Sequence, residues 1–397
     1  MRSQRDFQKF LDFDLLPYSS GANKIGLPEM LISPEIIPIR QEIIDEAGQI
    51  VKAFHFLRQM PLYQKSILSE GPEIVKWKPP NSSILMSYDF HLTSSGLKLI
   101  EINTNAACSL LLHALNIFNC VEQFGESSFP ERLKEEFIEE IRTFGLNGSN
   151  SITIAIIDDN LKKQKTYFDF LLSQTQIESW GWECILGEPQ DFILDEESGY
   201  LISKNGNRIH LVYNRLVDFL LESPNHNHLA LAYLRGKTCF SPNPHEYFLL
   251  SDKKRLVDIS TPGWLESLQV PDNMIQILRR TVEKTILVDL SKANELWQNR
   301  KSLFFKLRSS HSGKQAVRGK SITKKAFEHI LKNGNFVAQK FILAPKLKFP
   351  QSSQEFKFDL RFYAYKDAID LVGARLYNGA VTNFQNLGGG FASVKIV

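Results

Sequence analysis

The stretch Leu97-Lys98-Leu99-Ile100-Glu101-Ile102-Asn103-Thr104 is the part of the sequence around which the rest is interpreted. Residues 97–102 predict a β-strand. The run from Ser83 to Phe90 predicts a second strand just before it. Thr93-Ser94-Ser95-Gly96 supplies the turn between the two. The sequence therefore predicts a β-hairpin early in the chain.

The second strand of this hairpin places two oxygen-bearing side chains on one side, because residues two apart on a strand share a face. These are Glu101 and Asn103. A carboxylate and an amide oxygen suit Mg²⁺, which prefers hard oxygen ligands. Asp89, on the first strand, is a candidate third ligand. A solvated strand face is the alternative interpretation.

Helical patterns flank the hairpin. Apolar residues near helical spacing predict a helix from Pro38 to Met60. Phe129-Pro130-Glu131 opens a second predicted helix that runs to about Phe144, because proline favours the first turn of a helix. Residues 145–151 contain two glycines, two asparagines and two serines, and we expect a linker there.

The segment from 151 to about 245 predicts a parallel α/β layer. It alternates apolar, β-branched runs with a helical pattern, which is typical of such layers. The predicted elements are a strand at Ile152–Ile157, a helix near Lys162–Ser173, and strands at Glu183–Leu186 and His210–Tyr213. Arg215 follows the last strand. It either meets a substrate in a cleft between domains or forms an ordinary ion pair with Asp218.

The third part of the chain, from about Phe248, predicts a small lid over a phosphate. Leu303–Leu307 predicts a strand, and the polar loop Ser309-Ser310-His311-Ser312-Gly313 follows it. The remaining predicted elements are a strand at Gln315–Val317, a helix at Ile322–Lys332 with Ser321 as its N-cap, and a strand at Phe336–Ile342. His311 is a candidate ATP contact, or a solvent-facing loop residue.

One lysine of this region favours a polyphosphate site. Lys301 to Lys348 contains twelve Lys or Arg residues and one acid. Such a stretch is a solvated basic face, a nucleic-acid patch or a polyphosphate site. Lys306 lies inside an apolar strand, where lysine needs a partner, and a phosphate supplies one. The following loop is not a Walker loop, because Arg308 and Gln315 replace required residues.

Two further patterns bear on ligand binding. Gln339 and Lys340 interrupt an apolar strand whose backbone is a candidate for an adenine edge, or for a plain sheet edge. Arg361 and Arg375 lie on two predicted neighbouring strands, and two arginines can hold a carboxylate or phosphoryl group in bidentate fashion. Residues 388–390 are three glycines, which allow close backbone approach to a ligand or form a flexible turn.

Composition excludes several classes of protein. The apolar fraction is 43%, the charged fraction 23% and the formal net charge +3, as in ordinary globular proteins. The four cysteines show no CxxC spacing, so zinc, redox and disulfide frameworks are not expected. No run of about 20 apolar residues predicts a membrane helix. Residues 1–16 contain early charge and no apolar core of a secretory signal, so we expect a cytoplasmic protein.

Together these motifs resemble the ATP-grasp superfamily, in which an acidic ExN strand, a lysine-bearing lid and an arginine strand with glycines recur. Here the ExN strand comes first and the lid last. That order resembles the circularly permuted branch typified by eukaryotic glutathione synthetase. The matching segments are Leu97–Thr104, Lys253-Lys254 with Ser260-Thr261-Pro262-Gly263-Trp264-Leu265-Glu266, and Arg375 with Gly388–Gly390. The lid loop departs from the family, because Ser309–Gly313 replaces a glycine-rich loop.

The resemblance implies a role for each matching residue. Metal ligands would be Glu101 and Asn103, with Asp89 as a candidate. ATP contacts would be Lys253, Lys306, Ser309, Ser310, Gly313, Gln339 and Lys340. The acid substrate would lie at Arg375, Asn386, Gly388 and Gly389, and Arg361 and Arg375 would act in catalysis.

The expected fold is α/β (α+β): a circularly permuted ATP-grasp core with an inserted parallel α/β substrate domain and a small lid. The expected domains are 1–147, 148–247 and 248–397, with the lid at about 260–345. The expected activity is an ATP- and Mg²⁺-dependent ligase that forms a C–N bond between a carboxylic acid and an amine, such as an amino acid, peptide or polyamine. The resemblance implies a homodimer, and we expect neither nucleic acid nor a membrane as a partner. A small-molecule kinase and a non-catalytic nucleotide-binding regulator are the alternatives.

Overall fold

The largest sheet draws its strands from both ends of the chain. The computed structural model describes residues 4–12, 26–28, 30–125, 127–146, 152–309, 316–349, 355–379 and 389–397. Within these residues seven strands form a sheet in the order β1-β17-β16-β15-β2-β3, with β14 beside β15. They are β1 (Ile32–Ile39), β2 (Met86–Thr93), β3 (Gly96–Asn103), β14 (Lys346–Lys348), β15 (Glu355–Tyr365), β16 (Ala368–Tyr377) and β17 (Gly390–Ile396). The predicted hairpin is confirmed as β2–β3.

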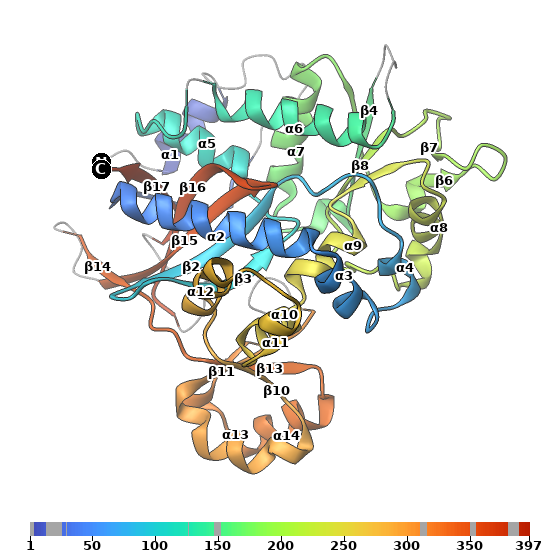
Figure 1. Cartoon of the computed structure of the whole chain (residues 1–397). Coiled ribbons are helices and arrows are strands. Elements are labelled where there is room, and N and C mark those ends of the chain that lie inside the picture. The colour runs from blue at the N-terminus through green and yellow to red at the C-terminus, as the bar shows by residue number, and fades with distance from the viewer. Residues whose placement is uncertain are drawn as a thin grey trace.

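All neighbouring strands of this sheet run antiparallel except β1 and β17, which are parallel. One face of the sheet is apolar, because every second residue of β2, β15 and β16 is a buried hydrophobic residue. Helices cover this face, and α2 lies along it (Figure 1). The covering elements are α2 (Gln41–Gln59), α3 (Pro61–Leu68), the π-helical turn Tyr247–Ser251, α10 (Lys254–Ser260), α11 (Trp264–Ser267) and α12 (Asp272–Thr281).

A second, four-stranded sheet confirms the predicted parallel layer. Its order is β5-β4-β8-β9, with all pairs parallel: β4 (Thr153–Ile157), β5 (Glu183–Gly187), β8 (Leu211–Asn214) and β9 (Cys239–Ser241). All five residues of β4 are buried, as expected for a sheet covered on both faces. The apolar side chains of one face belong to a cluster with α5 (Ser109–Phe118), α6 (Phe129–Thr143) and α7 (Tyr167–Ser179), which α1 (Gln4–Phe10) joins through α5. Those of the other face belong to a cluster with α8 (Asn227–Arg235) and the hairpin β6 (Phe192–Leu194)–β7 (Leu201–Ser203).

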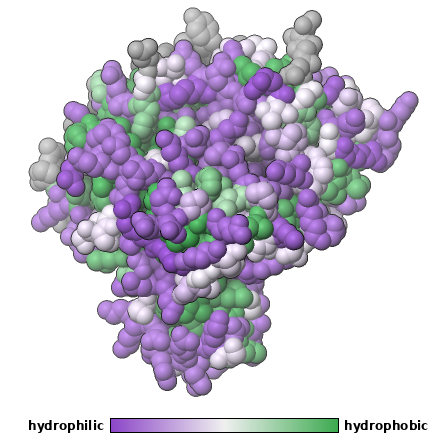
Figure 2. Space-filling view, in the orientation of Figure 1, coloured by the Kyte–Doolittle hydropathy of each residue, from purple (hydrophilic) through white to green (hydrophobic). Residues whose placement is uncertain are grey.

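A third sheet, also of four strands, forms a separate lobe with two helices. Its order is β10-β13-β11-β12, and it packs on α13 and α14, which lie below the main body in Figure 1. The elements are β10 (Thr285–Leu287), α13 (Ala293–Asn299), β11 (Leu303–Leu307), β12 (Val317–Arg318), α14 (Lys324–Asn333) and β13 (Phe336–Lys340). Figure 2 shows the same outline, a broad body and a narrower, mostly hydrophilic lobe.

Several predicted boundaries need correction. The first helix begins at Gln41, because Pro38 belongs to β1. The predicted helix near Lys162 begins only at Tyr167, because Asn160 turns the chain with φ 47° and a short 3-10 turn follows. In the lobe, Thr323 rather than Ser321 caps the helix, since its side chain accepts the N–H of Ala326.

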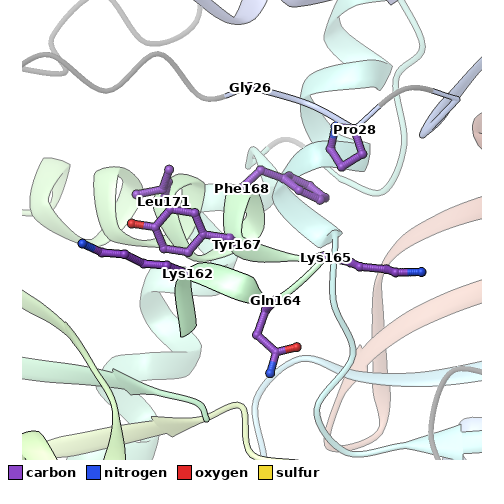
Figure 3. Close-up of a pocket in the computed structure, with 8 residues that line it drawn as sticks. All are labelled: Gly26, Pro28, Lys162, Gln164, Lys165, Tyr167, Phe168 and Leu171. Atoms are coloured by element: carbon purple, nitrogen blue, oxygen red, sulfur yellow. The ribbon is translucent and has the colours of Figure 1, made fainter. Parts of the chain in front are cut away.

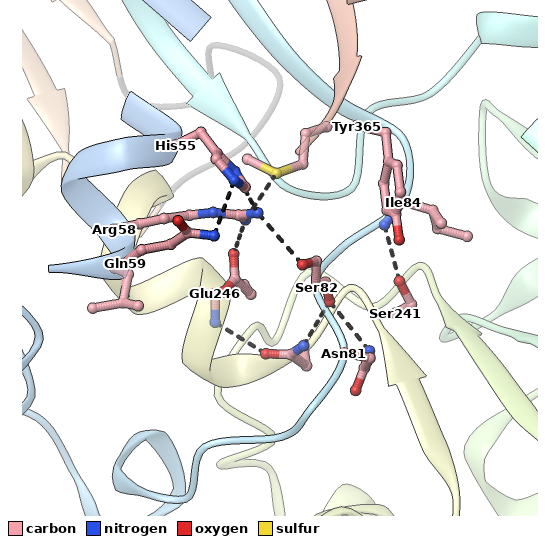
Figure 4. Close-up of polar contacts among 12 residues, drawn as sticks. His55, Arg58, Gln59, Asn81, Ser82, Ile84, Ser241, Glu246 and Tyr365 are labelled. Atoms are coloured by element: carbon pink, nitrogen blue, oxygen red, sulfur yellow. Dashed lines mark hydrogen bonds and ion pairs between the residues drawn. The ribbon is translucent and has the colours of Figure 1, made fainter. Parts of the chain in front are cut away.

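A buried polar network joins three segments of the main body (Figure 4). Arg58 of α2 forms an ion pair with Glu246, which follows β9 in a short helix, α9 (Pro244–Glu246). Asn81 donates to the carbonyl of Phe240 and to Glu140, each at 2.9 Å. The second sheet is therefore tied to α2 and α6 through hydrogen bonds that satisfy buried polar groups. Another short helix, α4 (Glu73–Lys76), packs against α9.

Among the described helices, none is both long enough and apolar enough to cross a lipid bilayer.

Candidate active site

The face of the large sheet opposite α2 carries a cluster of charged and amide side chains. Asp89 of β2 lies opposite Glu101 of β3 on one side and Arg361 of β15 on the other. Asp359 lies opposite Arg375 of β16. Because these residues alternate with the buried hydrophobic residues of the same strands, they project from the other face. We refer to this surface as the polar face.

Asp89 is the centre of the polar face and is fully buried. Its two oxygens accept hydrogen bonds from Arg361 Nε and Nη2, at 2.8 and 2.7 Å, and from Arg375 Nη2 at 2.9 Å. Arg375 Nε also donates to Asp359, at 2.7 Å. Burial opposes the charge of Asp89, but the two guanidinium groups outweigh it and hold the pKa of this carboxyl below its usual value.

Asn103 is oriented by the same carboxylate. Its Nδ2 donates to Asp89 Oδ2 at 3.2 Å and lies 3.4 Å from Ser87 Oγ. The amide oxygen therefore points away from Asp89. Glu101, one position along the same face of β3, lies 3.7 Å from the ammonium of Lys253. Glu101 and Asn103 are thus two oxygen donors side by side on one strand.

The lobe reaches this hairpin through Lys306. Strand β3 contains an irregularity, because Asp89 pairs with Glu101 but Phe90 pairs with Leu99, which leaves Ile100 as an extra residue. The Nζ of Lys306 donates to the carbonyl of Ile100 at 2.8 Å and to Gln339 Oε1 at 2.7 Å. The early hairpin and the late strand therefore meet, as the sequence predicts.

Lys306 has unusual surroundings for a lysine. Its side chain is buried, and burial lowers its pKa to about 8 even though Glu101 acts in the opposite direction. Within the part of the chain that the structure describes, no carboxylate lies within ion-pair distance of it. Its two acceptors are neutral oxygens, and the charge of Glu101 offsets only part of the cost of burying the ammonium.

The other candidate ATP contacts differ in their burial and in their distance from Lys306. Gln339 is buried beside Lys306, and its Nε2 lies 3.3 Å from the carbonyl of Leu99. Lys340 projects from the opposite side of β13, is mostly exposed and binds Glu283 at 2.9 Å. Ser309 follows β11 in a turn. Four predicted site residues and one further candidate lie outside the described residues: Ser310, Gly313, Asn386, Gly388 and His311. Gly389 is described and is buried at the start of β17.

At the carboxyl end of the second sheet, the structure contradicts one of the two interactions considered for Arg215. Arg215 does not pair with Asp218. Instead, its guanidinium donates to the carbonyls of Asn105 and Ala106, at 2.7 and 3.2 Å, and lies 3.9 Å from Asp169. Asp218 accepts from His226 at 2.8 Å. Among the residues that the structure describes, the buried Nε of Arg215 has no hydrogen-bond partner. The loop that Arg215 contacts, which contains Asn105 and Ala106, follows Asn103 closely.

Sequence reasoning missed two other polar contacts near the site. Arg308 of the lobe donates two hydrogen bonds to Asp252, and His91 of β2 lies between the carbonyl of Ile342 (3.1 Å) and the hydroxyl of Tyr377 (3.2 Å). Arg308 was detectable in principle, because it lies two residues after Lys306 and shares its side of the chain. His91 was detectable for the same reason, because it lies two residues after Asp89 on β2.

A cavity of about 520 Å³ lies apart from these residues (Figure 3). It is bounded by Gly26 and Pro28 on one side and by the start of α7 on the other, where Lys162, Lys165 and Tyr167 line it. None of the residues predicted to bind ligand contributes to it. The cavity is therefore separate from the predicted site.

Comparison with known proteins gives the fold. No protein-family model and no curated protein match the sequence. Among solved structures, this chain has neighbours that are similar to it in fold. One such structure is the apo form of a glutathione synthetase-like effector from Globodera pallida, with a TM-score of 0.59 and 13% identity over 92% of this chain and 90% of that one. A protein described as a gamma-glutamylcysteine synthetase, from Methylobacillus flagellatus, aligns over 90% of both chains with a TM-score of 0.49 and 10% identity. The likeness to the first of these structures extends over most of both chains and is a likeness of fold.

Proposed function

We propose that this chain is an ATP- and Mg²⁺-dependent ligase, on a circularly permuted ATP-grasp scaffold, that joins a carboxylic acid to an amine through an acyl phosphate. The observation that carries the proposal is the environment of Lys306. The ammonium is buried and donates to two neutral oxygens, and Glu101 offsets only part of the cost of its burial, so a further negative partner would stabilise it. A polyphosphate is such a partner, and the glutathione synthetase-like fold supports the same choice.

The nucleotide occupies the junction between the lobe and the hairpin. Lys306 and Lys253 bind its phosphates, because both ammonium groups lie near Glu101 at this junction. Gln339 lies on the adenine side, and the backbone of Lys340 rather than its side chain serves the base, since that side chain is paired with Glu283. Ser309, Ser310 and Gly313 contribute N–H and hydroxyl groups to the phosphates.

Glu101 and Asn103 fit a magnesium ion. Both are oxygen donors on one strand, and the amide nitrogen of Asn103 is already used by Asp89, which leaves its oxygen for the metal. When bound there, Mg²⁺ neutralises charge on the phosphates. Asp89 does not need to be a direct ligand, because its oxygens bind two arginines. We assign it to orienting Asn103, Arg361 and Arg375.

The acid substrate lies beside the arginine pair. Its carboxylate oxygen attacks the γ-phosphorus of ATP, the bond from that phosphorus to the bridging oxygen breaks, and ADP leaves. The amine then attacks the acyl carbon, its proton passes to solvent, and inorganic phosphate is released. Arg361 and Arg375 stabilise the charge that develops on the transferring group. The loop held by Arg215, together with Asn386, Gly388 and Gly389, encloses the substrate.

The test is a screen of the purified protein for ADP release against pairs of acids and amines, with mass detection of the product. Amino acids, short peptides and polyamines form the first panel. A stable adduct whose mass equals acid plus amine minus water supports the ligase. A phosphorylated compound without any adduct identifies a small-molecule kinase and contradicts the ligase.

A non-catalytic nucleotide-binding protein is the second candidate, and one observation favours it. Both arginines at the acyl end already have carboxylate partners, Asp89 for Arg361 and Asp89 with Asp359 for Arg375, so their charges are compensated without a substrate. Calorimetric binding of ATP and Mg²⁺ without turnover on any pair of the panel would select this candidate. ADP release that depends on both an acid and an amine would exclude it.

A further inference from the structure

Three consecutive residues connect the lobe, the hairpin and the helices of the main body. Asp252 binds Arg308 of the lobe, Lys253 lies 3.7 Å from Glu101 of β3, and Lys254 binds Asp258 at 2.7 Å. The segment lies where the π-helical turn ends and α10 begins. A displacement of the lobe therefore changes the surroundings of the proposed phosphate site directly.

The contact between Asp252 and Arg308 is two-pronged. Arg308 Nη2 lies 2.7 Å from Asp252 Oδ2, and Nε lies 3.2 Å from Oδ1. Asp252 is buried, and burial acts to raise its pKa, but Arg308 outweighs burial and the pKa of Asp252 lies below its usual value. Bidentate arginine–carboxylate pairs fix orientation as well as distance. This pair therefore sets the direction of the chain at the end of β11.

Lys306 and Arg308 attach the same strand to the main body at two points. Lys306 lies on β11, and Arg308 directly follows the end of this strand. Lys306 reaches the carbonyl of Ile100, and Arg308 reaches Asp252. Because β11 is an inner strand of the lobe's sheet, these two contacts, together with the one between Gln339 and the carbonyl of Leu99, fix the tilt of that sheet relative to the hairpin. The tilt decides whether the ammonium of Lys306 stays beside Glu101.

We propose that Asp252 and Arg308 are a positioning pair for nucleotide binding. The pair holds β11 in the orientation that places Lys306 at the phosphates, so that binding does not have to order the strand. The inference rests on the proposed function, because it takes the nucleotide site as given. It differs from a role of Arg308 as a phosphate ligand, since the arginine stays on Asp252 throughout.

Calorimetry with ADP and Mg²⁺ on the full chain tests the pair through a double-mutant cycle. The variants are Asp252→Asn, Arg308→Gln and the double variant. In the wild type, the backbone N–H of Lys254 donates to Asp252 Oδ1 at 2.8 Å. Asparagine keeps an oxygen for this hydrogen bond and so preserves the start of α10. We expect each single variant to weaken ADP binding about tenfold and the double variant to be no weaker than the weaker single. Arg308→Lys, which keeps the charge, recovers part of the affinity.

The matched control is Glu355→Gln, which breaks an exposed ion pair with Lys346 on the large sheet and should leave the affinity unchanged. Tighter ADP binding by Asp252→Asn would overturn the inference, because it would mean that the released arginine binds phosphate. Additive losses, or none, would overturn it as well.

Hydrogen exchange separates this inference from the proposed function. Without nucleotide, the amides of β11 should exchange at least about fivefold faster in both single variants than in the wild type, while those of β15 stay unchanged. If the wild type binds no ADP but this difference is present, the proposed function fails and the attachment of the strand stands. If β11 exchanges equally in all variants, the pair does not position it.

Discussion

The two faces of the seven-stranded sheet are built from the same strands and have opposite chemistry. Towards α2, residues such as Tyr88, Phe90 and Phe362 form a closed apolar core. On the polar face, their sequence neighbours Asp89 and Arg361 are buried charges held by other buried charges. Burial of hydrophobic residues favours folding, whereas buried charges contribute little unless each has its partner. The comparison supports the proposal that the polar face carries a ligand site.

The largest effect is expected where the polar face loses its central charge. Asp89→Ala leaves Arg361 and Arg375 without their shared carboxylate, and removal of one partner of a buried pair costs about 3–5 kcal/mol. A denaturant titration followed by circular dichroism measures the change. Glu355→Gln, at the exposed pair with Lys346 on the same sheet, should change stability by no more than about 0.5 kcal/mol. A loss below about 1 kcal/mol for Asp89→Ala would show that the cluster is solvated.

The next effect distinguishes function from stability where β3, at the edge of the large sheet, meets the lobe. Glu101→Ala and Lys306→Ala are each expected to reduce turnover about 100-fold, or about 3 kcal/mol, while the chain stays folded. Glu101 is partly exposed and Lys306 has only neutral acceptors, so neither removal breaks a buried ion pair with short contacts. Rates of ADP release, with thermal melting curves as the folding control, measure this. Normal turnover in both variants would refute the assignment of the phosphate site.

The prediction about Glu101 shows what the sequence reveals. The hairpin, the strand Leu303–Leu307 and the neighbouring strands that carry Arg361 and Arg375 were predictable, because each depends on local periodicity or short spacing. The meeting of Lys306 with the hairpin was predictable only through the resemblance to a family, since 206 residues separate it from Ile100.

The partners of Asp89 were not predictable in the same way. They lie 272 and 286 residues away in the sequence, and nothing in the spacing of a strand specifies which distant arginine reaches a given carboxylate. The same limit explains why Asp218 was a reasonable but incorrect partner for Arg215, whose guanidinium turns to backbone carbonyls of another segment. Strand β1 gave no periodic signal either, since Pro34 and Pro38 interrupt it at the sheet edge.

A smaller effect is expected where α5 packs on the polar face. A Cβ at Gly373 of β16 would lie 2.3 Å from a methyl carbon of Leu112, so Gly373→Ala forces the helix or the side chain to move. We expect a loss of about 1–3 kcal/mol. Gly48→Ala in α2 is the matched control, because a Cβ there meets nothing within 4 Å, and alanine should stabilise the helix by about 1 kcal/mol. Equal effects of the two substitutions would contradict this packing.

The smallest effect is a pH dependence that belongs to one lysine. Because burial lowers the pKa of Lys306 to about 8, the free protein loses this charge as the pH rises above 8, and phosphates bind the charged form. Nucleotide binding must then take up a proton, and the Kd should rise up to about tenfold per pH unit between roughly pH 8 and 10. The contribution of Lys306 to the stability of the fold changes with pH in the opposite direction from the affinity for nucleotide. The unfolded chain holds this proton up to a higher pH, so the contribution of Lys306 to the unfolding free energy increases over the same range. Calorimetry in buffers of different ionisation enthalpy counts the proton, and Lys306→Arg, which stays charged, should remove the pH dependence. The same pH dependence in Lys306→Arg would assign it to another group and would leave the buried ammonium without a role at the phosphates.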